Sequence, residues 1–252
     1  MERFFIGKIG VSVASMSSAL SKIEEDIKNK KHGYICIANS RVVHKANQDK
    51  VYLTIQNNSL MTLPDGMPLI WIAKNLGYKD AHKVSGPDLF MAVLELSKHK
   101  GYTHFFYGGT SETIQGIEER MHKDYPTVEI KGAVSPPFQP VEDFDVDDIA
   151  KEINRLKPSF FWCGLGAPKQ EQLIAKLQPK LDATTCIGVG LAFNYFTGSV
   201  KRAPKWMQSS GLEGIFRLIQ QPKFIKRAVV PLTWIMFQVL KTKFGKKFTN
   251  DL

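Results

Sequence analysis

Cysteine is scarce in this sequence, and long hydrophobic runs are absent from it. The three cysteines, Cys36, Cys163 and Cys186, all lie in apolar stretches typical of strands, and no two of them are spaced as CxxC. An odd number of buried thiols is typical of a reducing compartment, so we expect neither disulfides nor a zinc site. No stretch approaches the roughly 20 uninterrupted apolar residues that a membrane-spanning helix needs.

The first residues also lack the pattern of a secretory signal peptide. Glu2 stands beside Arg3, and Lys8 interrupts the apolar run that follows. A signal peptide combines a positively charged start with an unbroken apolar segment. We therefore expect the protein to begin and stay in the cytoplasm.

Acidic residues are rare in the last fifth of the chain, although the whole chain is basic. From Ser199 onward eleven basic residues stand against two acidic ones, so this tail holds +9 of the total net charge of +10. Such asymmetry indicates an anionic partner, which could be a membrane surface, a phosphorylated substrate or nucleic acid. The long aliphatic runs of the tail disfavour nucleic acid.

Apolar runs typical of strands alternate with helical patterns from Tyr34 to Gly190. This alternation predicts an α/β fold with a largely parallel sheet and helices on both of its faces. We expect one strand at Thr127–Lys131, followed by a proline-rich loop at Ala133–Asp148. The loop either covers the mouth of a crevice or is a solvated connection, and its composition slightly favours the connection. The sequence predicts a core at residues 1–198 and a helical appendage at residues 199–252.

Two strand-like runs end in Gly-x-Gly turns, at Gly164–Gly166 and Gly188–Gly190. The carboxyl ends of parallel strands meet at one edge, where ligands bind because backbone N–H groups and helix N-termini converge there. The same turns also serve as tight strand-to-helix connections. The first one lacks the third glycine of the dinucleotide fingerprint, since Lys169 stands at that position.

Polar side chains follow the first glycine turn closely. Pro168 suits the first position of a helix, and Lys169, Gln170 and Glu171 in its first turn can then reach into the crevice. After the second turn, the basic segment Lys201–Lys205 is a natural partner for an anionic group. These residues predict a polar site at this edge of the sheet.

Asp65 stands in a Pro-Asp-Gly turn between a short strand and a helix. This position places a carboxylate at the edge of the same crevice. Aspartate also caps helices well, so capping and chemistry are both consistent with its position.

The tail carries far more apolar surface than the end of a helix needs, and Lys and Arg flank it. Apolar side chains, Trp234 and a basic collar are typical of a helix that lies in the membrane interface. A core helix or a helix that forms a dimer would have a similar composition.

Four segments of the chain together resemble the WecG/TagA/CpsF glycosyltransferases. They are LPDGMPLIW (Leu63–Trp71), VSGPDLF (Val84–Phe90), FWCGLGAPKQE (Phe161–Glu171) and the long stretch from Gly188 to Arg227. The similarity covers nearly the whole chain in the right order, and joint occurrence makes it far more specific than any single motif.

The resemblance implies an inverting, metal-independent hexosyltransferase with a Rossmann-like core and no cofactor. Members of the family move a sugar, often N-acetylmannosamine or its uronic acid, from a UDP donor to a sugar linked to undecaprenyl diphosphate. They act at the cytoplasmic face of the membrane, and their products enter teichoic acid, common antigen, capsule or exopolysaccharide. The appendage supplies arginines to the active site and helps to hold the enzyme on the anionic membrane surface.

Carried over by position, the resemblance makes Asp65 the general base. Arg217 and Arg227 would stabilise the departing diphosphate, with Arg202 and Lys223 as their neighbours. The remaining residues expected to hold the donor are Asn39, Gly109, Gly164, Gly166, Lys169, Gln170, Glu171, Gly190 and Asn194. No metal ligand is assigned.

Two positions depart from the family pattern. Ala38 replaces a threonine that many members carry, while Asn39 is kept. Asn194 replaces the aspartate of the usual Ala-Phe-Asp sequence, so a charged acceptor becomes an amide. UDP-glucose, UDP-galactose or a UDP-uronic acid therefore remain alternative donors, and a non-catalytic nucleotide-binding protein docked on a membrane is an alternative of another class. The sequence leaves a homo-oligomer open.

Overall fold

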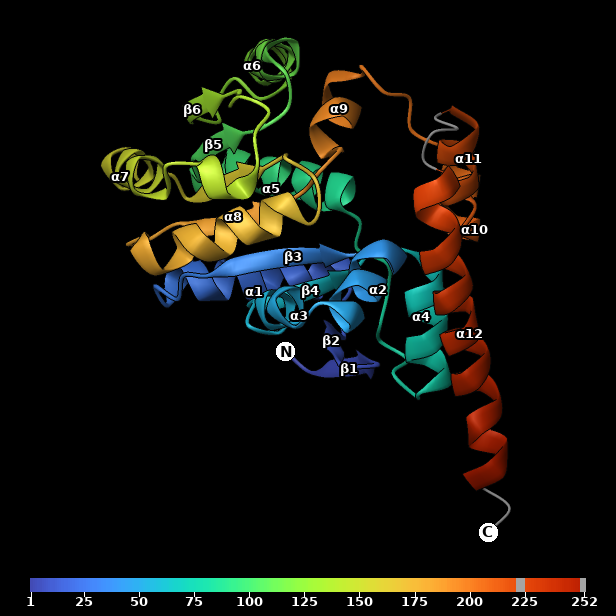
Figure 1. Ribbon diagram of the computed structural model, residues 1–252. Helices are drawn as coiled ribbons and strands as arrows, with labels where there is room; N and C mark the ends of the chain where they lie inside the picture. The colour runs from blue at the N-terminus through green and yellow to red at the C-terminus, as the bar shows by residue number, and fades with distance from the viewer. Residues whose placement is uncertain (221–224, 250–252) are drawn as a thin grey trace.

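A six-stranded sheet forms the centre of the protein. The structure is a computed structural model that describes residues 1–220 and 225–249 (Figure 1). The strand order is β4-β3-β8-β7-β5-β6, and all neighbouring strands are parallel. The strands are β3 (Tyr34–Ala38), β4 (Met61–Pro64), β5 (His104–Tyr107), β6 (Ile130–Val134), β7 (Phe160–Cys163) and β8 (Thr185–Gly188).

Successive side chains of each inner strand enter two different cores, because the side-chain period of a strand is two. In β7, Phe160 and Trp162 join one core, whereas Phe161 and Cys163 join the other. The first core is covered by α1 (Met16–Lys28), α5 (Gly86–Lys100), α6 (Ser111–Asp124) and α9 (Ala192–Thr197). The second is covered by α3 (Lys50–Asn57), α7 (Val146–Leu156) and α8 (Lys169–Leu177). Two short 3-10 helices lie at Val141–Asp143 and Gln178–Lys180.

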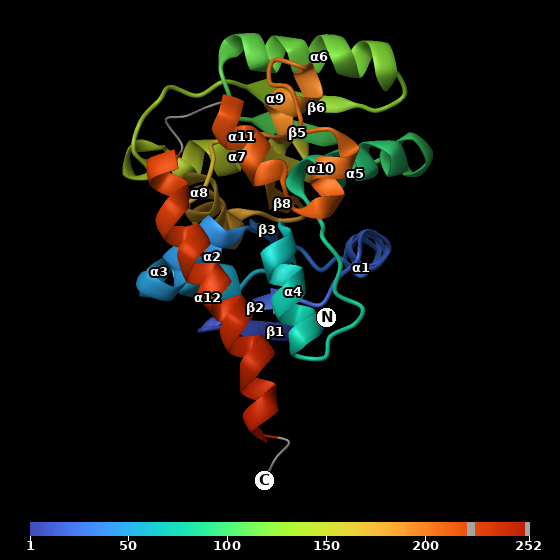
Figure 2. The same ribbon diagram turned by 90° about the vertical axis from the view of Figure 1, so that its right-hand side faces the viewer.

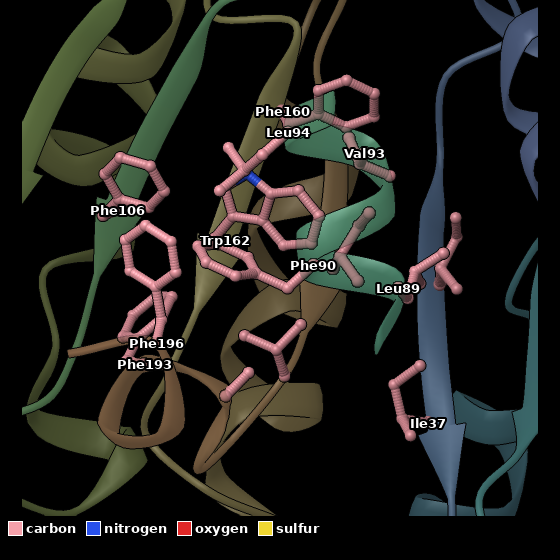
Figure 3. Close-up of a cluster of buried hydrophobic side chains, with 14 of the residues drawn as sticks. Ile37, Leu89, Phe90, Val93, Leu94, Phe106, Phe160, Trp162, Phe193 and Phe196 are labelled. Atoms are coloured by element: carbon pink, nitrogen blue, oxygen red, sulfur yellow. The ribbon is translucent and has the colours of Figure 1, made fainter. Parts of the chain in front are cut away.

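Phe90 of α5 is the centre of the first core (Figure 3). Its ring meets the Trp162 ring edge-on at 4.9 Å and the Phe196 ring at 5.2 Å, measured between ring centroids. The Phe193 ring lies 5.7 Å away. Aromatic pairs in this geometry add to the free energy gained from burial. The contacts hold α5 and α9 on the sheet, and both helices begin at its carboxyl edge.

A third core joins the two ends of the chain. The hairpin of β1 (Arg3–Ile6) and β2 (Ile9–Ser12) packs there with α2 (Ser40–Gln48), α4 (Met67–Asn75) and α12 (Ile225–Thr249). Ile235 and Val239 of α12 are buried in this core, and the Asn75 side chain donates a hydrogen bond to the Val239 carbonyl oxygen at 3.2 Å. The helix α12 therefore lies along α4 (Figure 2).

The expected α/β fold is confirmed, and all three cysteines are buried with free thiols. The strand expected at Thr127–Lys131 was placed too early, because β6 begins at Ile130. Val128 lies in a turn, and its apolar side chain packs into the first core instead of a strand. The appendage contains α10 (Lys205–Ser210) and α11 (Glu213–Gln220) besides α12, and α10 was not expected. The boundary between core and appendage at residue 198 stays a prediction.

Within residues 1–220 and 225–249, no helix combines the length and the apolar character needed to cross a bilayer. The longest helix, α12, is interrupted by charged residues toward its end.

Candidate active site at the carboxyl edge of the sheet

The glycine turns, Gly164–Gly166 and Gly188–Gly190, lie at the same edge of the sheet, as predicted. The strands β7 and β5 are neighbours, and the chain leaves them in opposite directions along the sheet. From β5 it passes through α6 to β6, and from β7 it passes through α8 to β8. Such a switch point is where open α/β sheets bind ligands. A Cβ atom on Gly108, which has a φ of +118°, would lie 2.8 Å from the Gly164 carbonyl carbon, so only glycine fits there. Around Gly166 the space is open.

The Gln170 side chain joins the two glycine turns. Its Oε1 accepts hydrogen bonds from the backbone N–H of Gly166 at 3.0 Å and of Gly190 at 2.9 Å. Its Nε2 donates to Glu171 Oε1 at 2.7 Å, and the Tyr52 hydroxyl donates to Glu171 Oε2 at 3.0 Å. Gln170 and Glu171 are both buried, and burial raises the pKa of Glu171. These side chains point into the protein and hold the turns together, and they do not reach into the crevice as we had expected.

Asp65 lies two strands from Gly190 along the edge, and the spacing of strands makes this about 10 Å. Its backbone N–H donates to the Ala38 carbonyl oxygen at 2.8 Å. The helix α4 has Gly66 as its N-cap, and no side chain forms a capping hydrogen bond. Of the two roles that the sequence allows for Asp65, the structure therefore disfavours capping.

Burial raises the pKa of Asp65 to about 6. The positive charge of Lys83 opposes this shift, the carboxylates of Glu213 and Asp88 add to it, and Arg202 opposes it. A partly buried carboxylate with a pKa close to neutral is the state that a general base needs.

Four charged side chains and one hydroxyl near Asp65 form a charge cluster, defined here as Lys83, Ser85, Asp88, Arg202 and Glu213. Arg202 makes a bidentate pair with Asp88, with N–O distances of 2.6 and 2.9 Å, and also donates to Ser85 Oγ at 3.1 Å. Glu213 accepts from Lys83 Nζ at 2.5 Å and from Arg202 Nε at 3.2 Å. The cluster thus connects the start of α5 with the start of α11.

The appendage covers the turn that holds Asp65. At Gly211, between α10 and α11, an added Cβ would lie 2.9 Å from Met67 Cβ, so the backbone packs directly on the first residue of α4. Arg217 lies on α11 and Arg227 in the first turn of α12. Lys223 and the side chains of Arg217 and Arg227 lie outside the described residues, and their roles stay predictions.

The loop after β6 contacts Gly109 and Lys169 at the carboxyl edge of the sheet. The preference for a solvated connection over a crevice cover stays a prediction. Ser135 Oγ donates to the Gly109 carbonyl oxygen at 2.9 Å, and Lys169 Nζ donates to the Gln139 carbonyl oxygen at 2.6 Å. The Phe138 ring is fully exposed, and Lys169 Nζ lies 4.5 Å from its centroid. Phe138 is a candidate site residue that sequence reasoning missed, since an aromatic residue in a loop has no periodic pattern to mark it.

Two expected site residues are engaged with nearby protein groups. The Asn39 side chain caps α2, because its Oδ1 accepts from the backbone N–H of Arg41 and Val42, each at 3.1 Å. Asn194 Nδ2 donates to Ser199 Oγ at 3.2 Å. A contact of either residue with a donor stays a prediction. Arg41 was not expected at the site, yet its guanidinium crosses the edge to donate to the Ala167 carbonyl oxygen at 3.2 Å.

The site combines a near-neutral carboxylate, Asp65, with cations at the carboxyl edge of an open α/β sheet. The sequence profile of the glycosyl transferase WecG/TagA/CpsF family matches residues 4–249. The chain therefore belongs to this family, and the expected glycosyltransferase class is confirmed.

Relatives with assigned activities point to one reaction. The chain is 28% identical over 235 residues to the N-acetylglucosaminyldiphosphoundecaprenol N-acetyl-beta-D-mannosaminyltransferase of Bacillus subtilis strain 168, covering 93% of this chain and 90% of the relative. Proteins of the same name from Bacillus spizizenii strain W23 and Staphylococcus aureus strain MW2 are 29% and 26% identical, each over 83% of this chain and 80% of the relative.

Proposed function

We propose that this protein transfers N-acetylmannosamine from a UDP donor to N-acetylglucosamine linked to undecaprenyl diphosphate. The observation that carries the proposal is the placement of Asp65. Its carboxylate makes no capping bond, has a pKa of about 6 and lies at the same edge of the sheet as the glycine turns, where the space around Gly166 is open. The names of the relatives supply the two sugars.

The donor lies over the glycine turns, and its sugar extends along the edge toward Asp65. The Asp65 carboxylate accepts the proton of the acceptor hydroxyl as that oxygen attacks the anomeric carbon from the face opposite UDP. The configuration at that carbon is thereby inverted. Fixed cations of the appendage stabilise the diphosphate as it leaves, so no metal ion is required.

The decisive experiment measures UDP release by the full chain with a short-chain N-acetylglucosaminyl diphosphate lipid. We expect release with UDP-N-acetylmannosamine and none without the acceptor. Parallel reactions contain the uronic acid of this sugar, UDP-glucose or UDP-galactose. Faster release with one of these would assign the same site to that donor, and no acceptor-dependent release with any of them would refute the proposal.

The exposed ring of Phe138 predicts how UDP binds. An exposed aromatic ring beside the glycine turns can stack on the uracil base, and such stacking is worth about 1–3 kcal/mol. We expect Phe138→Ala to weaken UDP affinity about 10-fold in a calorimetric titration. Phe5 lies on β1 and is 60% exposed, so Phe5→Ala is the matched control. Equal affinities of the two variants would exclude stacking.

The appendage also supports attachment at the inner surface of the membrane. Exposed apolar side chains cover much of α12, namely Val229, Val230, Leu232, Phe237, Leu240 and Phe244. They lie beside the basic residues of the same helix. Apolar and cationic side chains together bind the interface of an anionic bilayer.

Phe237 provides the test of this attachment because it is 63% exposed on α12. We expect Phe237→Glu to reduce binding to vesicles of phosphatidylglycerol and phosphatidylcholine about 10-fold or more in a sedimentation assay, since a buried Phe contributes roughly 1.5–3 kcal/mol. Phe5→Glu, at 60% exposure on β1, is the control that should bind normally. Unchanged binding of the Phe237 variant would contradict a membrane-bound α12.

A further inference from the structure

Glu213 has an unusual place in the charge pattern of the chain. It is one of two acidic residues after Ser199, and it opens the helix that carries Arg217. One oxygen of its carboxylate accepts a hydrogen bond from Lys83, and the other accepts one from Arg202. The three side chains are only 16–23% exposed, so solvent screens these pairs less than pairs on an open surface.

The partners of Glu213 belong to the immediate surroundings of Asp65. Lys83 precedes Val84, whose backbone N–H donates to the carbonyl oxygen of Pro64 at 2.8 Å, and Pro64 is the neighbour of Asp65. Arg202 is held in turn by its bidentate pair with Asp88. The charge cluster therefore attaches α11 to the segment that runs beside the catalytic carboxylate.

We propose that Glu213 is a positioning residue, which holds the first turn of α11 near Asp65 by pairing with Lys83 and Arg202 and thereby sets the position of the Arg217 backbone. Arg217 follows Glu213 by four residues, a little more than one helical turn. Holding the first turn of α11 in place therefore fixes the position of the Arg217 backbone. The inference rests on the proposed function, because Arg217 acts on the diphosphate that leaves during sugar transfer.

The remainder of the appendage is attached in another way. The helix α12 is held by Ile235 and Val239 in the third core and by the hydrogen bonds of Asn75 to Val239 and Thr242. Figure 2 shows α11 beside the top of α12, away from the part that packs on α4. Loss of the Glu213 pairs should thus release α11 while α12 stays in place.

The first test is a double-mutant cycle with UDP release as the measurement. We expect Glu213→Ala to lower kcat/KM about 10- to 100-fold, because small displacements of a catalytic group have effects of this size. Lys83→Met should have a similar effect, and the double variant should be no worse than Glu213→Ala alone. The exposed pair Glu152 and Arg155 on α7 is the control, and its removal should leave the rate unchanged. Independent effects that multiply in the double variant would overturn the inference.

The second test asks whether Glu213 acts through Arg217. In the otherwise native chain we expect Arg217→Gln to lower kcat about 100-fold, as the loss of a fixed cation does. In the Glu213→Ala background the same change should cost less than about 3-fold, because Arg217 is already displaced. A full 100-fold effect in both backgrounds would show that Glu213 does not position Arg217.

Hydrogen exchange separates this inference from the proposed function, since it needs no substrate. Glu213→Ala should speed exchange of the α11 backbone amides and leave those of α12 near Val239 unchanged. If the native enzyme released no UDP but α11 were loosened in this way, the proposed function would fail while the attachment stood. If the native enzyme were active but Glu213→Ala left exchange in α11 unchanged, the inference about Glu213 would fail while the proposed function stood.

Discussion

Asp65→Asn should lower kcat/KM for sugar transfer about 100- to 10 000-fold, the range that a general base contributes. The amide has nearly the same shape as the carboxylate but cannot take the proton of the acceptor hydroxyl. UDP affinity should stay close to native, because Asp65 lies two strands away from Gly190 and, in the proposed arrangement, faces the sugar of the donor and not its UDP part. UDP release measures the first effect and titration with UDP measures the second.

The pH profile of the native enzyme is an independent test of Asp65 as the general base. With a pKa of about 6, Asp65 is protonated at lower pH and cannot act as a base. The rate should therefore fall tenfold for each pH unit below about 6 and level off above it. Asp80→Asn is the control, since Asp80 is exposed in the loop after α4 and its loss should leave both rate and profile unchanged.

The substitution Asp65→Asn should also stabilise the folded protein. The pKa of Asp65 in the folded protein lies above the ordinary value of 3.8, so the folded state binds this proton more tightly than the unfolded state does. The contribution of Asp65 to the free energy of unfolding is then highest below pH 4 and decreases as the pH rises to about 6, by up to about 3 kcal/mol. Asp65→Asn removes this loss, and its melting temperature at pH 7 should exceed that of the native chain. A variant that is both inactive and less stable would contradict the assignment of Asp65 as a base.

Gln170→Ala should lower the free energy of unfolding by about 2–4 kcal/mol, because it leaves two backbone N–H groups and one buried carboxylate oxygen without a partner. The N–H groups are those of Gly166 and Gly190, so both glycine turns lose the bond that joins them. UDP affinity should fall with stability. Chemical denaturation and calorimetric titration measure the two effects.

A glutamine on an exposed helix face is the matched control for this result. Gln115 of α6 is exposed, and its side chain bonds only to Glu119 of the same helix, so Gln115→Ala should change neither stability nor affinity. If Gln170→Ala behaved like Gln115→Ala, the turns would be held by their backbone alone.

Local patterns in the sequence were sufficient to predict the sheet and the edge at which the two glycine turns meet. Apolar runs such as Phe160–Cys163 are buried on both faces, as strands of a parallel sheet must be, and the glycines after them indicate where each strand ends. Asp65 could be placed at the same edge because it directly follows a strand. These features depend on residues that are neighbours along the chain.

The directions of individual side chains could not be predicted in this way. Gln170 and Glu171 look like exposed polar residues of a first helical turn, yet the turn after β8 and Tyr52 of α3 bury them. Lys83 and Glu213 are separated by 130 positions, and no local pattern couples them. The family resemblance supplied the candidates for the reactive residues, whereas these contacts depend on how distant elements pack.

The third core has a consequence for how the enzyme is made. It is built from the hairpin at the beginning of the chain and from α12 at its end, with Ile235 buried between them. During synthesis on the ribosome the hairpin, α2 and α4 emerge long before α12, so their shared apolar surface stays uncovered until α12 has been made. A nascent chain interrupted before Ile235 would therefore expose this surface to chaperones and proteases.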